Sequence, residues 1–365
     1  MRALAHTAAL FALVASAAPA SPVVGAQCGS SLRFFGNGVA APGLDRVEIP
    51  LDTPHRPVDV GLGDFTIEWW MKATLADNVP SPACTAGNDN WITGNILLDR
   101  DVFGQGDWGD WGVSLRNGVL AFGVADSGSG QGICGGTLVA DGSWHHVAIA
   151  RRASDGRMRV WVDGAVDAEG FGPMGDITYR DGRPTSYPAS DPLLVLGAEK
   201  HDAGAAYPSY SGYLDELRLS TMVRYDGNFT PPAAPFAPDA TTAALYHLDE
   251  GSGNLVGDSS GAAGGPSLGT RRFGGTPAGP LWSSDTPFPP PACGAPDQLV
   301  FQDDMLSGPA THVACVTVTA GPNLWIVPLG LVSFLAREAV ILRDGFTVAL
   351  DAEFAAATDC AAGAP

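Results

Sequence analysis

Two groups of tryptophan residues with acidic and amide neighbours are the first candidates for ligand contact in this sequence. Trp91 follows Asn88-Asp89-Asn90, and a second group is the run Asp107-Trp108-Gly109-Asp110-Trp111. An indole can cover the C–H side of a sugar ring, while carboxylates and carboxamides bond its hydroxyl groups. We therefore predict that Trp91, Trp108, Asp110 and Trp111 contact carbohydrate.

Trp161 is a third candidate for ligand contact because of its place in an alternating strand. Met158, Val160 and Val162 point to one face of that strand, and Trp161 points to the other with the arginines. Tryptophan is also an ordinary core residue, so burial is the alternative for each of these side chains.

His145-His146 is the other pair that invites a chemical interpretation. Adjacent residues of an extended strand point to opposite faces, so the two imidazoles cannot chelate one metal ion together. We expect the pair to be structural.

The formal net charge of −19 excludes one class of partner. An acidic chain without a Lys/Arg cluster repels phosphate backbones, so we expect no nucleic-acid partner. The carboxylates could instead hold Ca²⁺, which is abundant outside cells, although solubility alone also explains the charge.

The first 26 residues have the pattern of a signal peptide. Arg2 precedes an apolar segment over residues 7–18, and small residues end at Ala26, where we expect cleavage. A membrane anchor is the weaker alternative because the segment is short. A lipoprotein anchored through Cys28 is another, although Gln27 replaces the small residue preferred there. The expected protein is secreted, with no transmembrane segment in the mature chain and with surface attachment left open.

Six cysteines in an exported chain predict disulfides whose connectivity the sequence leaves open. The preferred pair is Cys84–Cys134, which would tie the insertion at 75–94 to another irregular loop. Cys28–Cys293 and Cys315–Cys360 would each close the ends of one domain.

Short strands should position the candidate residues. Asn117-Gly118, Asp155-Gly156 and Asp163-Gly164 are strong turn signals, and 47 glycines with 29 prolines leave no room for long helices. The expected strands are Leu32–Phe35, Arg46–Leu51, Phe65–Ala73, Asn95–Asp99, Trp111–Leu115, Val119–Ala125, Ser143–Arg152, Arg157–Asp163, Pro192–Ala198, Gly212–Ser220, Ala243–Leu248 and Leu281–Trp282. This spacing predicts an all-β fold, a two-sheet antiparallel jelly-roll sandwich over residues 29–288.

The remainder of the chain has a different pattern. A proline-rich linker over 289–297 leads to a β-rich C-terminal module over 298–360. Leu324…Phe334-x-Ala336 and Phe346…Phe354-x-Ala356 look like two copies of one unit about twenty residues apart. Such a repeat favours a small β-solenoid or stacked β-sheet, with an irregular pair of hairpins as the alternative.

Five segments together carry a family resemblance. They are 34–38 with 46–50, 65–70, 144–148 through 162–164, 212–219, and 245–253 with 258–261. In this order the chain resembles the LamG-like jelly-roll domain of the concanavalin A-like lectin/glucanase superfamily over residues 29–288. The tail resembles short Gly- and Phe-punctuated β modules at the C-terminal ends of some exported bacterial proteins.

The resemblance implies two things about the site. Related jelly rolls hold one structural Ca²⁺ near the last core strand, and Asp215 matches that position, with the turn at Gly36–Gly38 expected beside it. The alternative for Asp215 is a sheet-end residue that bonds backbone amides. Laminarinase-like relatives carry Glu-x-Asp-x-x-Glu for hydrolysis, which this sequence lacks; Asp167-x-Glu169 and Asp215-Glu216 are the nearest approaches.

The sequence thus predicts a secreted, non-catalytic binding module for carbohydrate or a glycosylated, cell-surface protein, with a tail that serves attachment or export. It is not expected to be an enzyme. A structural or adhesion protein that binds another protein is the second hypothesis, and a glycoside-active enzyme with an unrecognised site is the third.

Overall fold

The computed structural model describes two compact units of the chain, each on its own. The described residues of the first unit are 29–87, 91–103, 109–179 and 185–289. Those of the second are 298–307, 309–314, 317–327, 331–336, 339–348 and 353–358. The predicted signal peptide over 1–26, most of the linker over 289–297, and Cys28, Cys293, Cys315 and Cys360 lie outside them.

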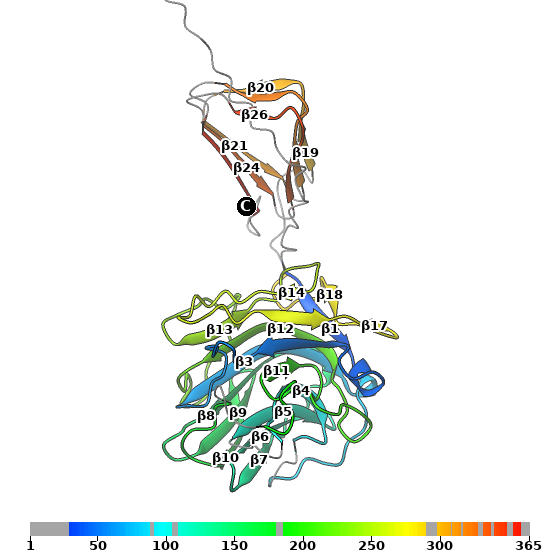
Figure 1. Cartoon of the computed structure of the whole chain (residues 1–365), viewed down its shortest axis with the longest axis vertical. Coiled ribbons are helices and arrows are strands. Elements are labelled where there is room, and N and C mark those ends of the chain that lie inside the picture. The colour runs from blue at the N-terminus through cyan, green and yellow to red at the C-terminus, as the bar shows by residue number, and fades with distance from the viewer. Residues whose placement is uncertain are drawn as a thin grey trace, which may run out of the picture. The chain divides into compact units, whose positions relative to one another are not determined.

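The first unit is a sandwich of two sheets (Figure 1), each with eight strands in the described residues. The first sheet runs β10 (Ala165–Phe171), β9 (Arg157–Val162), β8 (Asp141–Arg151), β3 (Phe65–Thr74), β12 (Ser211–Ser220), β1 (Ser31–Phe35) and β18 (Leu281–Ser283), with β13 (Thr242–Tyr246) also paired to β12. The second runs β14 (Leu255–Val256), β15 (Gly269–Arg272), β2 (Arg46–Pro50), β11 (Leu193–Leu196), β4 (Asn95–Arg100), β5 (Asp110–Arg116), β6 (Val119–Ala125) and β7 (Gly130–Cys134). All these pairs are antiparallel, which confirms the predicted fold class.

Alternation of side chains builds this sandwich. In β5, Trp111, Val113 and Leu115 enter the core between the sheets, and Leu120, Phe122 and Val124 do the same from β6. The Asn117-Gly118 turn joins the two strands with φ values of 50° and 82°, the left-handed geometry of a two-residue hairpin. The outer faces of the two strands consequently carry small residues, among them Gly112 and Gly123.

The strands that the sequence predicts are present with small differences at their ends, and several short strands were not expected. These are β7, β10, β14 and β15, together with the two-residue strands β16 (Gly274–Gly275) and β17 (Ala278–Gly279). Most of them have only two to five residues, and β10 is largely exposed, so they carry little alternation of apolar and polar residues. The only helical elements in the described residues are the three-residue turns η1 (Asn37–Val39) and η2 (Leu75–Asp77), and neither could cross a bilayer.

The second unit is a parallel β-solenoid. Its three sheets are β19 (Gln298–Phe301), β22 (Thr317–Ala320) and β25 (Ala339–Leu342); β20 (Asp304–Leu306), β23 (Leu324–Ile326) and β26 (Thr347–Val348); and β21 (Pro309–Ala314), β24 (Leu331–Ala336) and β27 (Glu353–Thr358). Buried Val318, Ile326 and Phe334 belong to one apolar core inside the coils. The expected repeat is real, and the pairing of Trp325 with Thr347 fits the predicted match of Leu324 to Phe346. Phe334 pairs with Ala356 rather than Phe354, so that second match was wrong by two residues.

Candidate functional site

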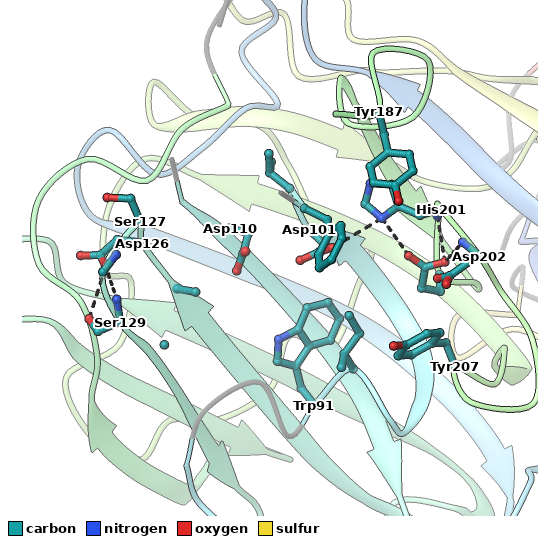
Figure 2. A pocket seen from close by; sticks show the side chains of 17 residues that line it. Trp91, Asp101, Asp110, Asp126, Ser127, Ser129, Tyr187, His201, Asp202 and Tyr207 are labelled. Carbon is teal, nitrogen blue, oxygen red and sulfur yellow. Dashed lines mark hydrogen bonds and ion pairs between the residues drawn. The ribbon is translucent and has the colours of Figure 1, made fainter. Parts of the chain in front are cut away.

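A groove of ≈ 450 Å³ opens at one end of three neighbouring strands in the second sheet of the sandwich (Figure 2). Six segments meet there, namely the residues before and after β4, the start of β5, the turn between β6 and β7, and the residues before and after β11. The lining residues are Trp91, Ile92, Asp101, Val102, Phe103, Asp110, Ala125, Asp126, Ser127, Gly128, Ser129, Gly130, Tyr187, Glu199, His201, Asp202 and Tyr207.

Trp91 lies at the base of this groove, against the outer face of the sheet. Only 2% of the residue is exposed, because its indole lies over Gly112 of β5 and Gly123 of β6. A Cβ at either glycine would overlap indole atoms, so the two glycines create the hollow that the ring fills. Ser114 Oγ donates to the Trp91 carbonyl at 2.5 Å, which holds the backbone of the loop to the same sheet.

The loop that carries Trp91 is fixed to β7. Cys84 and Cys134 form a disulfide with their Cα atoms 5.7 Å apart, which confirms the preferred pairing. Beside it, Gly87 and Gly132 exchange both backbone hydrogen bonds, at 3.1 and 2.6 Å. The 75–94 insertion is therefore fixed to the second sheet and forms a wall of the groove with it. This is expected for a functional loop that a rigid scaffold holds in place.

Two aromatic side chains in the groove are exposed. Phe103, just after β4, is 61% exposed and Tyr187 is 42% exposed, with ring centroids 6.0 Å apart and planes inclined by 42°. The Tyr187 ring also contacts the His201 ring, with centroids 4.9 Å apart. Tyr207 lies half-buried near Trp91 in the groove (Figure 2). These faces, rather than those of Trp91 or Trp111, are available to stack on a ring.

His201 is the centre of an ion-pair network at the edge of the groove. Its Nδ1 lies 2.9 Å from Glu199 Oε1 and 3.4 Å from Asp101 Oδ2, and its Nε2 lies 2.6 Å from Asp191 Oδ1. Burial alone would lower the pKa of His201, but the hydrogen bonds to Asp191 and Glu199 raise it to about 10. His201 is therefore an imidazolium at neutral pH.

This network has the composition and the spacing of a small metal site. One ligand atom each from Asp101, Glu199 and His201 lie within 4.8 Å of one another. Metal binding needs a neutral imidazole with a free nitrogen, and both nitrogens of His201 already meet carboxylates. We interpret the cluster as the His201 imidazolium surrounded by the carboxylates of Asp101, Glu199 and Asp191.

Asp99 connects the two strand ends that carry this network. Its Oδ1 accepts from the Asp101 N–H at 2.7 Å and its Oδ2 accepts from the Lys200 N–H at 2.8 Å. Burial and the nearby Glu199 charge raise the pKa of Asp99 to about 7. The carboxyl thus ties the end of β4 to the end of β11, which fixes the spacing of the groove wall.

The predicted contact residues divide into three groups. Trp91 and Asp110 line the groove, Trp91 through an edge only. Trp108 lies outside the described residues. The predictions for Trp111 and Trp161 were wrong, because both are 0% exposed.

Trp111 and Trp161 are buried for different reasons. Trp111 points into the main core, where its ring centroid is 6.0 Å from that of Phe65. Trp161 does point to the outer face of its sheet, as predicted, but Val223, Tyr225 and Phe229 pack over it. Its Nε1 donates to the Gly227 carbonyl at 3.0 Å, within the covering segment.

Sequence reasoning did not single out Phe103, Tyr187, Asp101 or His201. The available signal was two charged runs that follow apolar strands, Asp99-Arg100-Asp101 and Glu199-Lys200-His201-Asp202. Only the pairing of β4 with β11, which are far apart in the sequence, brings the two runs together.

The two residues predicted to hold Ca²⁺ do not lie side by side. Leu32 pairs with Leu214, which places Asp215 opposite Ser31, while Gly36 follows the other end of β1. Asp215 is 2% exposed, and its carboxyl accepts from the Glu216 N–H at 2.8 Å and the Thr286 hydroxyl at 2.7 Å. Burial raises its pKa to about 9, so it is neutral at pH 7.

The turn at Gly36 has a different carboxylate beside it. Asp45 Oδ2 accepts from the Phe35 and Asn37 N–H groups at 2.7 and 2.9 Å, on either side of Gly36. Asp45 Oδ1 is buried and has no hydrogen-bond partner among the described residues. Burial raises the pKa of this carboxyl to about 6.

Comparison with known proteins gives one match in sequence and several in structure. Residues 48–226 match the sequence model described as the concanavalin A-like lectin/glucanases superfamily. A candidate carbohydrate-binding protein from Bacteroides ovatus has 15% identity and a TM-score of 0.39, over 68% of this chain and 58% of its own length. The chain therefore spans little more than half of that protein.

Two further structures are similar at the same level. Domains LG4-5 of the mouse laminin alpha1 chain have 15% identity and a TM-score of 0.35, over 67% of this chain and 54% of theirs. The CBM40 domain of the Ruminococcus gnavus IT-sialidase has 17% identity and a TM-score of 0.32, over 49% of this chain and 88% of its own. Values this low say nothing about a ligand.

Proposed function

Because residues 48–226 belong to the concanavalin A-like lectin/glucanase superfamily, we propose that the groove lined by Phe103, Tyr187 and Asp101 binds carbohydrate. The observation that carries this proposal is the pair of exposed aromatic faces in a groove that also carries five carboxyl groups and the hydroxyls of Ser127 and Ser129. A sugar ring stacks its C–H side on such faces and offers hydroxyl groups to the surrounding carboxylates.

The polar side of the groove supports this function. Asp101 and Asp110 lie on one wall, and Ser127 and Ser129 lie on the turn between β6 and β7 (Figure 2). Asp126 Oδ1 holds that turn by accepting from the N–H groups of Gly128 and Ser129, at 2.8 and 2.7 Å. Fixed acceptors and hydroxyls opposite an aromatic pair are the arrangement that orients a sugar.

We propose that binding occurs without hydrolysis. Among the five acidic side chains that line the groove, Asp101 and Asp110 hydrogen-bond each other. A retaining glycosidase needs its carboxyls about 5–5.5 Å apart, with the glycosidic bond between them, and an inverting enzyme needs a wider gap. The contact between Asp101 and Asp110 leaves no such space between these two carboxyls.

Serine-based hydrolysis has no support either. Residues 265–269 have the Gly-x-Ser-x-Gly spacing of a nucleophile elbow. Ser267 is only 1% exposed, however, and its Oγ has no hydrogen-bond partner among the described residues. A nucleophilic serine needs both access and an adjacent base.

We also propose that the protein acts outside the cell. The Cys84–Cys134 disulfide supports this location, because such bonds persist in oxidising compartments.

Loss of the exposed ring of Tyr187 is expected to weaken sugar binding at least tenfold, about 1.4 kcal/mol, without a change in melting temperature. The side chain is 42% exposed, so its removal leaves no core cavity. The measurement is a glycan array followed by titration calorimetry of wild type, Tyr187→Ala and Phe103→Ala.

The matched control for that experiment is Tyr213→Ala, because Tyr213 is also partly exposed but contacts Trp144 and Arg33 outside the groove. Equal affinity of wild type and Tyr187→Ala for the best array ligand would place the binding site elsewhere.

Ca²⁺, if the protein holds one, is proposed at Asp45 beside Gly36 rather than at Asp215. A buried carboxylate oxygen without a hydrogen-bond partner suits a hard cation, whereas each oxygen of the Asp215 carboxyl already accepts a hydrogen bond, from the Glu216 N–H and the Thr286 hydroxyl. Ca²⁺ at about 100 times its dissociation constant should stabilise metal-free protein by about 2.7 kcal/mol, which raises the melting temperature by several degrees.

The test of the Ca²⁺ site compares Asp45→Asn with Asp215→Asn. The thermal shift should vanish in the first variant and persist in the second. No shift in the wild type, or a shift that survives Asp45→Asn, would remove this site.

A further inference from the structure

The charge of the groove limits which sugars it can hold. Among the described residues, its lining contains five acidic side chains and one histidine, and no lysine or arginine. The acidic residues are Asp101, Asp110, Asp126, Glu199 and Asp202. An acidic wall attracts cations and repels carboxylate or sulfate groups on a ligand.

The cations nearest the groove are already engaged by the protein. His201 is committed to Glu199 and Asp191 through its two ring nitrogens. Lys200 is 3% exposed, and its Nζ donates to the carbonyls of Asp191 and Leu193 at 3.0 and 2.9 Å. Neither side chain is free to bond a ligand anion.

Arg100 does not offset the charge of the groove either. Its guanidinium is fully buried and donates to the carbonyls of Gly109 and Ile177, behind the groove wall. Lys200 and Arg100 therefore hold backbone in place and do not line the groove, whereas the His201 imidazolium lines it but is held between Glu199 and Asp191.

Two of the acidic side chains are left to act on a ligand. Asp126 and Asp202 stand at different places around the groove (Figure 2), and neither forms an ion pair with a described residue. Asp202 is exposed and Asp126 is half-buried. A bound sugar would pass between these carboxylates and the rings of Phe103 and Tyr187.

A metal ion is the other cation that acidic residues attract, but the network does not favour it. The carboxylates of Glu199 and Asp191 are directed at His201, whose proton a metal would have to displace. An ammonium group needs no such displacement, because it can approach Asp126 and Asp202 from the open side of the groove.

Resting on the proposed carbohydrate function, we infer that the groove selects glycans with free amino groups, that is, hexosamine units that are not N-acetylated. The aromatic pair supplies stacking for the ring, and the carboxylates bond the ammonium group. Glycans with uronic acid or sulfate groups are excluded by the same charges.

The experiment uses three β-1,4-linked oligosaccharides of equal length, built from glucosamine, N-acetylglucosamine and glucose. Their binding to the full chain is measured by calorimetry at about pH 6, where an amine of this kind is protonated. The glucosamine oligomer should bind at least tenfold more tightly than the other two. High salt should remove most of that difference, because exposed charges are screened.

Two variants test the source of the preference. The double variant Asp126→Asn/Asp202→Asn should reduce the difference between the glucosamine and glucose oligomers to less than about threefold, chiefly through weaker binding of the glucosamine oligomer. Asp344→Asn is the control, because it removes an exposed acidic residue in the solenoid unit. A variant that lowers both affinities equally would show that these residues act structurally, which contradicts the inference.

The outcomes separate this inference from the proposed function. Stronger binding of the N-acetylated, the neutral or an acidic glycan overturns the amine preference and leaves carbohydrate binding intact. Binding that requires added Ca²⁺ and is insensitive to the amine also overturns it. If no glycan on a broad array binds, the proposed function fails and the inference fails with it.

Discussion

Replacement of Trp91 by alanine is expected to destabilise the jelly-roll unit by about 3–5 kcal/mol. The indole is 2% exposed and fills the hollow above Gly112 and Gly123, where it packs with Ile96 and Ala121. The disulfide at Cys84 and the rigid sheet keep the loop and the strands apart, so the cavity cannot close easily.

Equilibrium denaturation in urea measures this loss of stability. Trp325→Ala is the control, because Trp325 lies in the solenoid and is 52% exposed; its cost should be within about 0.5 kcal/mol. A cost below about 1 kcal/mol for Trp91→Ala would mean that the indole does not fill the hollow, and that it is a ligand platform as the sequence suggests.

The second large effect is expected for His201→Gln, which should cost about 3–5 kcal/mol at pH 7. The substitution keeps a polar side chain of similar size but removes the charge between Glu199 and Asp191. Both carboxylates are nearly inaccessible to solvent, so they would face each other without a cation. His55→Gln is the control, because the His55 side chain is 51% exposed.

The pH dependence of this stability has a defined sign. The pKa of His201 is raised to about 10 in the folded protein, so the folded state keeps a proton that the unfolded chain releases above about pH 6.5. Its contribution is complete below pH 6.5 and is lost as the pH rises through 10. Wild type should lose stability between pH 7 and pH 10, and His201→Gln should lose less.

Carboxylates also raise the pKa values of His145 and His247. These two histidines contribute equally to the pH dependence of wild type and His201→Gln, so they cancel when the stabilities of the two proteins are subtracted. Parallel loss of stability in the two proteins would show that His201 is not the protonated centre of the network.

The fold could be predicted from the sequence because its signals are local. Alternation in β5, β6 and β9 and the turns at Asn117-Gly118 and Asp155-Gly156 each involve a few neighbouring residues. The same alternation places Trp111 with Val113 and Leu115 on the core face, so its burial was available from the sequence. The prediction gave more weight to the neighbours of Trp111, Asp110 and Gly109, than to this alternation.

The site could be predicted only in part because it depends on contacts between distant segments. Trp161 is buried by residues 223–229, which no local pattern connects to β9. Phe103 and Tyr187 meet because β4 and β11 are neighbours in the sheet, although almost a hundred residues separate them. The Cys84–Cys134 disulfide was the one long-range signal that the sequence carried, and it located the correct wall of the groove.

The most direct test of the central claim is a crystal structure of the protein with the best glycan from the array. We predict a sugar ring within stacking distance of Tyr187 or Phe103, with hydroxyl or amino groups bonded to Asp101, Asp126 or Asp202. Sugar bound at another surface, with this groove filled only by solvent, would contradict the account.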